Sequence, residues 1–315
     1  MLLFQSCGIS LSREAFFIIV LYWVPKKYGN MTYRPFKTLL FGFAFSPKLE
    51  INILETSRIA HFFGARLILM HVGDHNPEKE VQLQAILQGV QYSDVRIETH
   101  WRNGRPIPAI LQACREFNID LLVLGAIQHE NLFQFYVGSI ARKLTRQVVC
   151  SVLLLIRPSA IRVPCQHVVV NGLDAPETPF AIAMAFYAAH ALGAKQITIV
   201  EEILQKEVQV TVEDDRSLKR ANIMKERLKW REESRVRKIL KTIPKKQLKG
   251  LTVKNQSIFG KRGYSIGHYA EVVRADLLVM NAPEKSGLLD RIFTHDIEYI
   301  LSDLPTDVLI IRKKN

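Results

Sequence analysis

Short apolar segments alternate along the chain with longer segments in which apolar residues recur every three or four positions. In the first half, the apolar segments predict strands at 38–43, 66–72, 95–101, 120–124 and 151–156. The segments with helical spacing predict helices at 48–63, 80–90, 106–117 and 138–147. Strands that are apolar throughout are buried on both faces, as in the parallel sheets of α/β proteins. We therefore predict a doubly wound parallel sheet.

The arrangement of the first half recurs in the second. Residues 47–65 and 176–194 both begin with proline, end in Ala-His-x-x-Gly-Ala or a close variant, and are apolar at helical spacing between. In each half a glycine precedes by sixteen residues the aspartate that opens a later strand, as Gly104 precedes Asp120 and Gly260 precedes Asp276. Such self-similarity is the sequence signature of a repeated structural unit.

The repeat also sets the predicted domain boundaries. The offset between the halves grows from 129 residues at the repeated helix to 156 at the later strand, so the second half carries about 27 additional residues. We predict an N-terminal extension over 1–34 and two tandem domains at 35–158 and 162–315, each with a five-stranded parallel sheet. A basic helical insert is expected within the second domain at about 203–249.

Most of the net charge belongs to that insert. The chain has 43 Lys plus Arg against 30 Asp plus Glu, and residues 216–249 alone hold fourteen basic and three acidic side chains. Apolar residues recur there at helical spacing, which predicts an amphipathic helix that ends at Pro244. Two interpretations stay open: a solvated surface helix, or a helix that docks to an acidic partner, RNA or an anionic lipid surface. No nucleic-acid-binding motif accompanies it, so no specific nucleic acid is predicted.

The other compositional features narrow the class of protein. Hydrophobic residues make up 48% of the chain, which excludes a disordered or collagen-like protein. Four scattered cysteines without a CxxC pair argue against a disulfide scaffold or a zinc module and favour the cytoplasm. The apolar run at 15–24 is too short to span a membrane. It is interpreted either as an interfacial or partner-binding helix or as part of a dispensable extension over 1–30.

A candidate anion site follows the fourth strand of the first half. This strand ends at Gly125, a loop runs over 126–137, and Gly138 and Ser139 open the next helix. Glycine lets backbone amides approach an anion closely, and the positive end of a helix favours negative charge. Ordinary capping chemistry would explain the same residues, so spacing alone leaves both interpretations open.

At this point the sequence resembles the universal stress protein superfamily, over 35–158 and more loosely over 162–315. The resemblance rests on FSP after the first strand, MHV at the end of the second, RNGRPIPAIL at 102–111, and DLLVLG followed by a spaced Gly-Ser. Nucleotide-binding members carry Gly, two residues, Gly, nine residues, then Gly-Ser or Gly-Thr. This chain places Gly125, Gln128 and Gly138-Ser139 in that pattern. The resemblance implies an adenine nucleotide alpha hydrolase-like fold in each half.

The resemblance also implies a ligand and its contacts. ATP or another adenine nucleotide, with Mg²⁺ near the phosphates, would bind the first domain through residues at the ends of strands and the starts of helices: Val72, Gly104, Gly125, Gly138 and Ser139. Two departures weaken this site, because Ala44 stands where ATP-binding members have aspartate and Gln128 replaces a glycine.

The second domain departs further from the family pattern, and no nucleotide is predicted there. At the motif it carries Asn281, Glu284, Thr294 and His295. Asp174 aligns with the first-strand aspartate only after a shift of one residue, since an ungapped alignment gives Leu173.

No assembled catalytic set accompanies the candidate site. The chain lacks a GxSxG elbow and a Walker loop, and the Cys114 thiol falls in the apolar pattern of a helix. His71 and His75 flank Asp74, but this segment has the pattern of a strand end entering a loop rather than of a metal site. We therefore predict no catalytic residue and no metal site.

These inferences predict a non-catalytic, cytoplasmic, universal stress protein-like binding or regulatory protein of the stress response. Two alternatives remain: a slow ATP hydrolase or nucleotide-gated switch, and an adaptor that docks to a membrane or a transporter through the basic insert. The two halves are expected to pack as an intramolecular pseudo-dimer through strands 151–156 and 307–311, or the chain to form a homo-oligomer. A protein partner of unknown identity is also expected.

Overall fold

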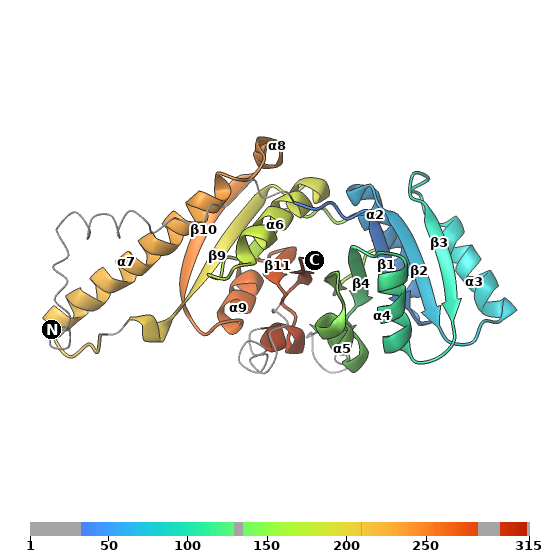
Figure 1. The fold of residues 1–315 in the computed structure, drawn as a ribbon, viewed down its shortest axis with the longest axis horizontal. Helices are drawn as coiled ribbons and strands as arrows, with labels where there is room; N and C mark the ends of the chain where they lie inside the picture. The colour runs from blue at the N-terminus through green and yellow to red at the C-terminus, as the bar shows by residue number, and fades with distance from the viewer. Residues whose placement is uncertain (1–32, 129–134, 209, 283–296, 314–315) are drawn as a thin grey trace, which may run out of the picture.

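A computed structural model describes residues 33–128, 135–208, 210–282 and 297–313. Most of the predicted N-terminal extension, together with Glu284, Thr294 and His295, lies outside these residues. The described chain forms one ten-stranded sheet with helices on both faces (Figure 1). The predicted fold class is confirmed.

The first half follows the predicted order of strands and helices. Its strands are β1 (Thr38–Phe43), β2 (Arg66–Val72), β3 (Ile97–Arg102), β4 (Leu121–Gly125) and β7 (Ser151–Leu155). Its helices are α2 (Leu49–Phe63), α3 (Pro77–Gln88), α4 (Pro106–Glu116) and α5 (Ser139–Gln147). A small antiparallel pair, β5 (Ile127–Gln128) and β6 (Phe135–Tyr136), lies between β4 and α5.

The second half repeats this order with one enlarged connection. Its strands are β8 (His167–Asn171), β9 (Gln196–Leu204), β10 (Thr252–Gly260), β11 (Leu277–Asn281) and β12 (Asp307–Ile311). Its helices are α6 (Thr178–Leu192), α7 (Asp215–Leu240), α8 (Lys245–Leu248) and α9 (Tyr264–Val272), with a 3₁₀ turn at Gln205–Glu207. Residues 297–302 are also helical.

The sheet is built from two equal halves that meet at their last strands. The strand order is β10-β9-β8-β11-β12-β7-β4-β1-β2-β3, and neighbouring strands within each half run parallel. β12 and β7 pair antiparallel, with Val308 opposite Leu154. The predicted contact between the two final strands is therefore confirmed, and it joins the halves into one sheet.

The aspartate of the repeat has the same structural role in both halves. The carboxylate of Asp120 accepts hydrogen bonds from the backbone amides of Lys37 and Thr38, at 3.0 and 3.2 Å. Asp276 likewise accepts from the amides of Gln166 and His167, at 2.7 and 2.9 Å. Each aspartate thus ties the start of its half's first strand to the start of the fourth, because its carboxylate accepts from two backbone amides that have no strand partner on that side within the described chain.

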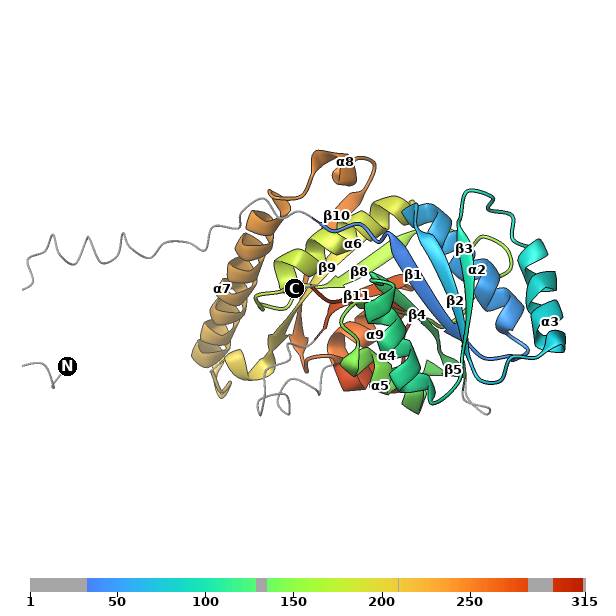
Figure 2. The ribbon, with the colours of Figure 1, turned by 45° about the vertical axis from the view of Figure 1, so that its right-hand side comes forward.

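Helices cover both faces of the sheet, with α2, α3, α6 and α7 on one and α4, α5 and α9 on the other (Figures 1 and 2). The helix layer that contains α2 and α6 is continuous between the two halves. The ring of Tyr187 on α6 stacks on Phe63 of α2 with 5.5 Å between ring centroids, and the Tyr187 hydroxyl accepts a hydrogen bond from the Phe36 amide. The two halves therefore share a core as well as a sheet.

The basic segment is the crossover helix between β9 and β10. α7 stands in the place that α3 takes between β2 and β3, but it has 26 residues where α3 has 12. A capping box opens it, in which the Asp214 carboxylate accepts from the Ser217 amide at 2.7 Å. Leu228, Val236 and Ile239 are buried, and the last two belong to the core on one face of the sheet. Within the described residues no helix is both long and apolar enough to cross a membrane.

Candidate functional site

The five predicted site residues lie at the carboxyl ends of the first-half strands. Val72 is the last residue of β2 and Gly125 the last of β4. Gly104 lies in the turn between β3 and α4 with φ +109, a conformation that favours glycine. Gly138 caps α5 and Ser139 is its first residue. Because the carboxyl ends of parallel strands share one edge, the fold brings all five to the edge where such sheets bind ligands.

Among the described residues, the start of α5 is exposed and uncapped. Gly138 has φ −59 and ψ 162, and no side chain caps the first turn. Ser139 and Ile140 are both exposed, and no acidic residue lies in that turn. Backbone amides at an uncapped helix start carry partial positive charge and lack intrahelical partners. This helix start therefore has the features of an anion-binding element.

Asn52 on α2 is a candidate that the sequence pattern did not mark. Its side-chain nitrogen donates to the Lys48 carbonyl at 2.7 Å, and its buried Oδ1 has no hydrogen-bond partner among the residues that the structure describes. A Cβ added to Gly125 would lie 3.5 Å from this oxygen. Asn52 thus places an unsatisfied acceptor directly behind the exposed end of β4, and a buried polar atom of this kind is uncommon.

An aromatic cluster lies over the neighbouring ends of β2 and β3. Phe45 stacks on Trp101 with 5.8 Å between ring centroids, and His71 meets Trp101 edge-on at 5.1 Å. The Trp101 ring also meets His75 at 4.4 Å. These rings were not predicted as a group, because they come from three separate strand ends.

The histidines of this cluster have other partners than a metal. His71 Nδ1 lies 3.1 Å from the Phe43 carbonyl oxygen, and His75 Nε2 lies 3.1 Å from Glu80 Oε2. In the part of the chain that the structure describes, no three His, Cys, Asp or Glu side chains gather as a metal site. The geometry accounts for both rings through packing and local hydrogen bonds.

The corresponding edge of the second half is occupied by a side chain of α7. Arg235 donates from Nη2 to the Gly172 carbonyl just beyond β8, and its Nε lies 3.7 Å from Asp174 Oδ1. The Glu232 carboxylate, 2.9 Å from Arg235 Nε, holds the guanidinium in place. At the end of β11, Asn281 donates to the Thr178 hydroxyl at 2.8 Å. Side chains of the protein itself thus use the polar groups of this edge.

Two buried glutamates on β9 add to the polar side chains that occupy the second-half edge but not the first-half edge. Glu202 accepts hydrogen bonds from the amides of Gly263 and Ile266, at 3.1 and 2.9 Å, and so caps α9. Burial raises the pKa of Glu201 to about 7, although the Ser257 hydroxyl donates to it at 2.9 Å and Arg235 lies nearby. A carboxylate already occupies the start of α9, where the first half has only the turn at Gly104.

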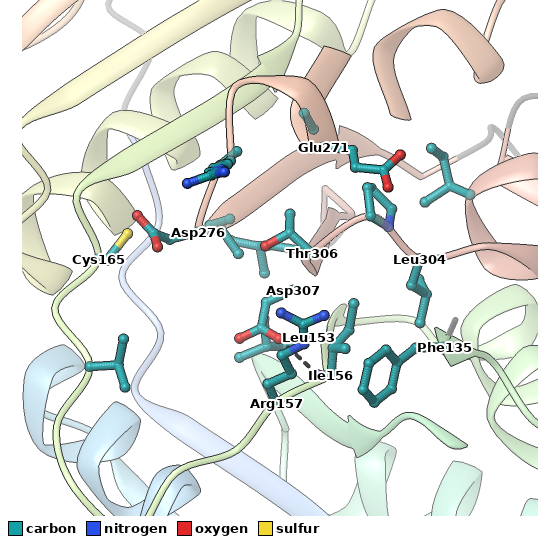
Figure 3. A pocket seen from close by; sticks show the side chains of 18 of the residues that line it. Phe135, Leu153, Ile156, Arg157, Cys165, Glu271, Asp276, Leu304, Thr306 and Asp307 are labelled. Carbon is teal, nitrogen blue, oxygen red and sulfur yellow. Dashed lines mark hydrogen bonds between the residues drawn. The ribbon is translucent and has the colours of Figure 1, made fainter. Parts of the chain in front are cut away.

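A cavity of about 960 Å³ lies where β7 meets β12 and is lined by residues of both halves (Figure 3). Asp307 accepts from the Ile156 amide at 2.7 Å, and burial raises its pKa to about 7. Burial likewise raises the pKa of the Cys165 thiol to about 12, with Asp276 adding to the shift. This thiol is therefore protonated at neutral pH and is a poor nucleophile. None of the five predicted site residues lines the cavity.

Comparisons with known proteins identify the family. The sequence profile of the universal stress protein family matches residues 76–155. Universal stress protein Sll1388 of Synechocystis is 30% identical over 113 residues, which cover 34% of this chain and 73% of the relative. The chain belongs to the universal stress protein family. Four of the five predicted site residues of this universal stress protein fall within the matched profile, and Val72 lies just before it.

Solved structures show the same fold over nearly the whole described length. A putative universal stress protein from Pseudomonas aeruginosa superposes with a TM-score of 0.62 and 15% identity, covering 88% of this chain and 93% of that one. A universal stress protein from Archaeoglobus fulgidus gives a TM-score of 0.60 and 12% identity, covering 87% and 98%. At such identities the likeness concerns the fold alone.

Proposed function

We propose that this universal stress protein is a non-catalytic binding and regulatory protein of the stress response that takes one adenine nucleotide, with Mg²⁺, at the first half. The observation that supports the proposal is the uncapped start of α5, whose first residues are exposed at the same sheet edge as Gly125. Membership of the family supports the biological role. The free thiols of Cys114 and Cys165 support a cytoplasmic location.

The proposed contacts follow from the chemistry of the edge. The amides of Gly138 and Ser139 and the Ser139 hydroxyl would hold the phosphates, as helix starts do in other anion sites. Gly125 lets the ligand approach the sheet closely, while Val72 and Gly104 flank the nucleoside. Ala44 supplies no carboxylate, and a lost charged hydrogen bond weakens binding by about 1.5–3 kcal/mol. We therefore expect weaker binding than an aspartate at this position would give.

One site for each chain is proposed, rather than two. Arg235 already bonds the Gly172 carbonyl and faces Asp174 at the equivalent edge of the second half. A ligand there would have to displace a guanidinium that Glu232 also holds. That displacement would leave Glu232, only 5% exposed, with one cation fewer.

Calorimetric titration of the full chain with ATP and ADP in the presence of Mg²⁺ tests the proposal. Ser139→Asp places a carboxylate at the start of α5 and should weaken binding about tenfold or more, because it repels the phosphates. Ser93→Asp is the matched control, since it adds the same charge in an exposed turn before β3, at the opposite edge of the sheet.

The expected result is saturable binding at one site for each chain, weakened by the first substitution only. Absence of saturation at millimolar nucleotide, two equal sites, or equal effects of the two substitutions would contradict the proposal. Incubation with ATP and product analysis separates binding from hydrolysis. Steady release of ADP that Ser139→Asp abolishes would favour the hydrolase alternative.

A further inference from the structure

α7 presents an apolar and cationic surface on the side turned away from the sheet. Trp230 is 70% exposed and Ile223 46% exposed, although both are large apolar side chains. The two lie seven residues apart, or nearly two helical turns, and therefore share one face. Lys219 and Arg227 line the same surface hollow, as do the acidic side chains of Asp215 and Glu226. We call Lys219, Ile223, Arg227 and Trp230 the outer face of α7.

The packing of the helix explains why this face stays open. Val236 and Ile239 of α7 are buried in the core on one face of the sheet. Figures 1 and 2 both place α7 at the far end of the molecule, beyond the edge strand β10. Within the described chain, the helix thus contributes one face to the core and leaves the other uncovered.

The two cations of the outer face are unpaired within the described chain, and the surrounding residues 216–249 hold fourteen basic and three acidic side chains. Lys219 and Arg227 form no ion pair with any residue that the structure describes, in contrast to Lys229, which pairs with Glu226. Beyond the helix, Lys245, Lys246 and Lys249 are all exposed. Large apolar side chains among exposed cations are typical of helices that lie in a membrane interface.

The spacing disfavours a second helix as the partner of this face. A coiled-coil seam uses residues spaced alternately by four and three positions, here Lys219, Ile223, Glu226 and Trp230. Two of these four side chains are charged. A nucleic-acid platform is disfavoured as well, because Trp230 is the single exposed aromatic ring of α7. An anionic lipid surface satisfies both components, the cations through headgroups and the apolar side chains through the acyl boundary.

We propose that the outer face of α7 docks on membranes that contain anionic lipid, with Trp230 and Ile223 entering the interface. At about 1.5 Å per residue, α7 is about 39 Å long and can lie flat along such a surface. Each cation near an anionic membrane strengthens binding about fivefold. The proposal is independent of the nucleotide site, which lies in the other half of the sheet.

Sedimentation of the full chain with vesicles tests the proposal. Phosphatidylcholine vesicles, with and without phosphatidylserine, are compared at low and high salt, because salt screens the attraction to lipid headgroups. The emission of Trp230 gives a second readout, isolated by comparison with Trp230→Phe. We expect salt-sensitive binding to the anionic vesicles only, with a blue shift and quenching by brominated lipid.

Charge reversal locates the docking face. Lys219→Glu with Arg227→Glu should lower binding about thirtyfold or more, at about fivefold for each cation lost. Trp230→Ser should lower it about tenfold, since the side chain no longer enters the interface. Arg34→Glu with Lys313→Glu is the matched control: both residues are exposed, Arg34 lies against α6 and Lys313 follows β12 in the middle of the sheet, and the net charge changes equally. This control pair should bind as the wild type does.

Three results would overturn the proposal. The first is failure of the wild-type protein to sediment with anionic vesicles at low salt. The second is an equal loss of binding in the α7 pair and in the control pair, which would indicate net charge rather than a defined face. The third is equally tight binding to RNA or polyglutamate without a change in Trp230 emission, which would favour a polyanionic macromolecule.

Discussion

Arg235 joins three groups where α7 crosses the end of β8, and Arg235→Ala should destabilise the second half of the sheet. The guanidinium donates to the Gly172 carbonyl, pairs with Glu232 at 2.9 Å and faces Asp174 at 3.7 Å. Its side chain is 13% exposed and that of Glu232 is 6% exposed. The ion pair is therefore largely shielded from water.

The expected loss follows from the bonds removed. The alanine variant loses two charge-assisted hydrogen bonds, each worth about 1.5–3 kcal/mol. Breaking a buried pair from one side costs about 3–5 kcal/mol when the remaining charge has no other partner. Glu232 keeps a bond to Arg231 Nε at 2.7 Å, so the cost should be smaller. We expect the free energy of unfolding to fall by about 2–4 kcal/mol.

A double-mutant cycle isolates the ion pair. Urea unfolding at pH 8 is followed by circular dichroism for Arg235→Ala, Glu232→Gln and the double variant. The double variant should be less destabilised than the sum of the single variants by about 1 kcal/mol or more, because it leaves no buried charge alone. Arg237→Ala, at an exposed cation of the same helix, is the control and should change stability by less than about 0.5 kcal/mol.

Two results would refute this account. If Arg235→Ala were as mild as Arg237→Ala, the guanidinium would not be held at the sheet edge in solution. Additive single variants would show that Glu232 and Arg235 do not act as a pair. A further consequence concerns Glu201, because the charge of Arg235 lowers the pKa of that carboxyl. Removing the arginine should raise the Glu201 pKa further, which carboxyl NMR titration measures.

The remaining predictions concern buried carboxyls and the joint between the halves. Burial raises the pKa of Glu201 from 4.5 and that of Asp307 from 3.8, both to about 7. Between the ordinary pKa of about 4 and the raised pKa of about 7, the folded state binds more protons than the unfolded state. The free energy of unfolding should therefore fall as pH rises from about 4 to 7. Glu201→Gln should reduce this slope and raise the free energy of unfolding at pH 8 by up to about 3 kcal/mol; an unchanged slope in urea unfolding would contradict it. Leu154→Ala, at a fully buried position in β7, should cost about 2–5 kcal/mol and lower Tm in calorimetry.

The fold was predictable because its signals are local and repeated. The two strands that join the halves, β7 and β12, are continuous apolar runs. In each half the fourth strand begins directly after an aspartate. Asp120 and Asp276 recur because the same two amides need an acceptor in both halves. The pairing of β7 with β12 followed from their equivalent positions at the end of each half.

The surroundings of the candidate site were not predictable in the same way. Phe45, His71 and Trp101 are far apart in the sequence, and only the register of β1, β2 and β3 brings them together. In that register Phe43 lies opposite His71, and His71 opposite Trp101. Asn52 was missed for a similar reason, since its approach to Gly125 depends on how α2 packs on the sheet. The choice of Arg235 from fourteen basic residues in 216–249 has no sequence signal at all.

The two ends of α7 require different explanations. Beyond residue 227 the helix buries Leu228, Glu232, Val236 and Ile239, and this end supplies the arginine that fills the second-half edge. Before residue 228 it buries Ala221 alone. Core packing therefore accounts for a helix about as long as α3, and an exposed helical extension of this size is marginal in water without other support. The Asp214 cap and continuation from the packed end stabilise the first turns, but neither requires Ile223 and Trp230 to be apolar. A surface that receives these two side chains does require them to be apolar.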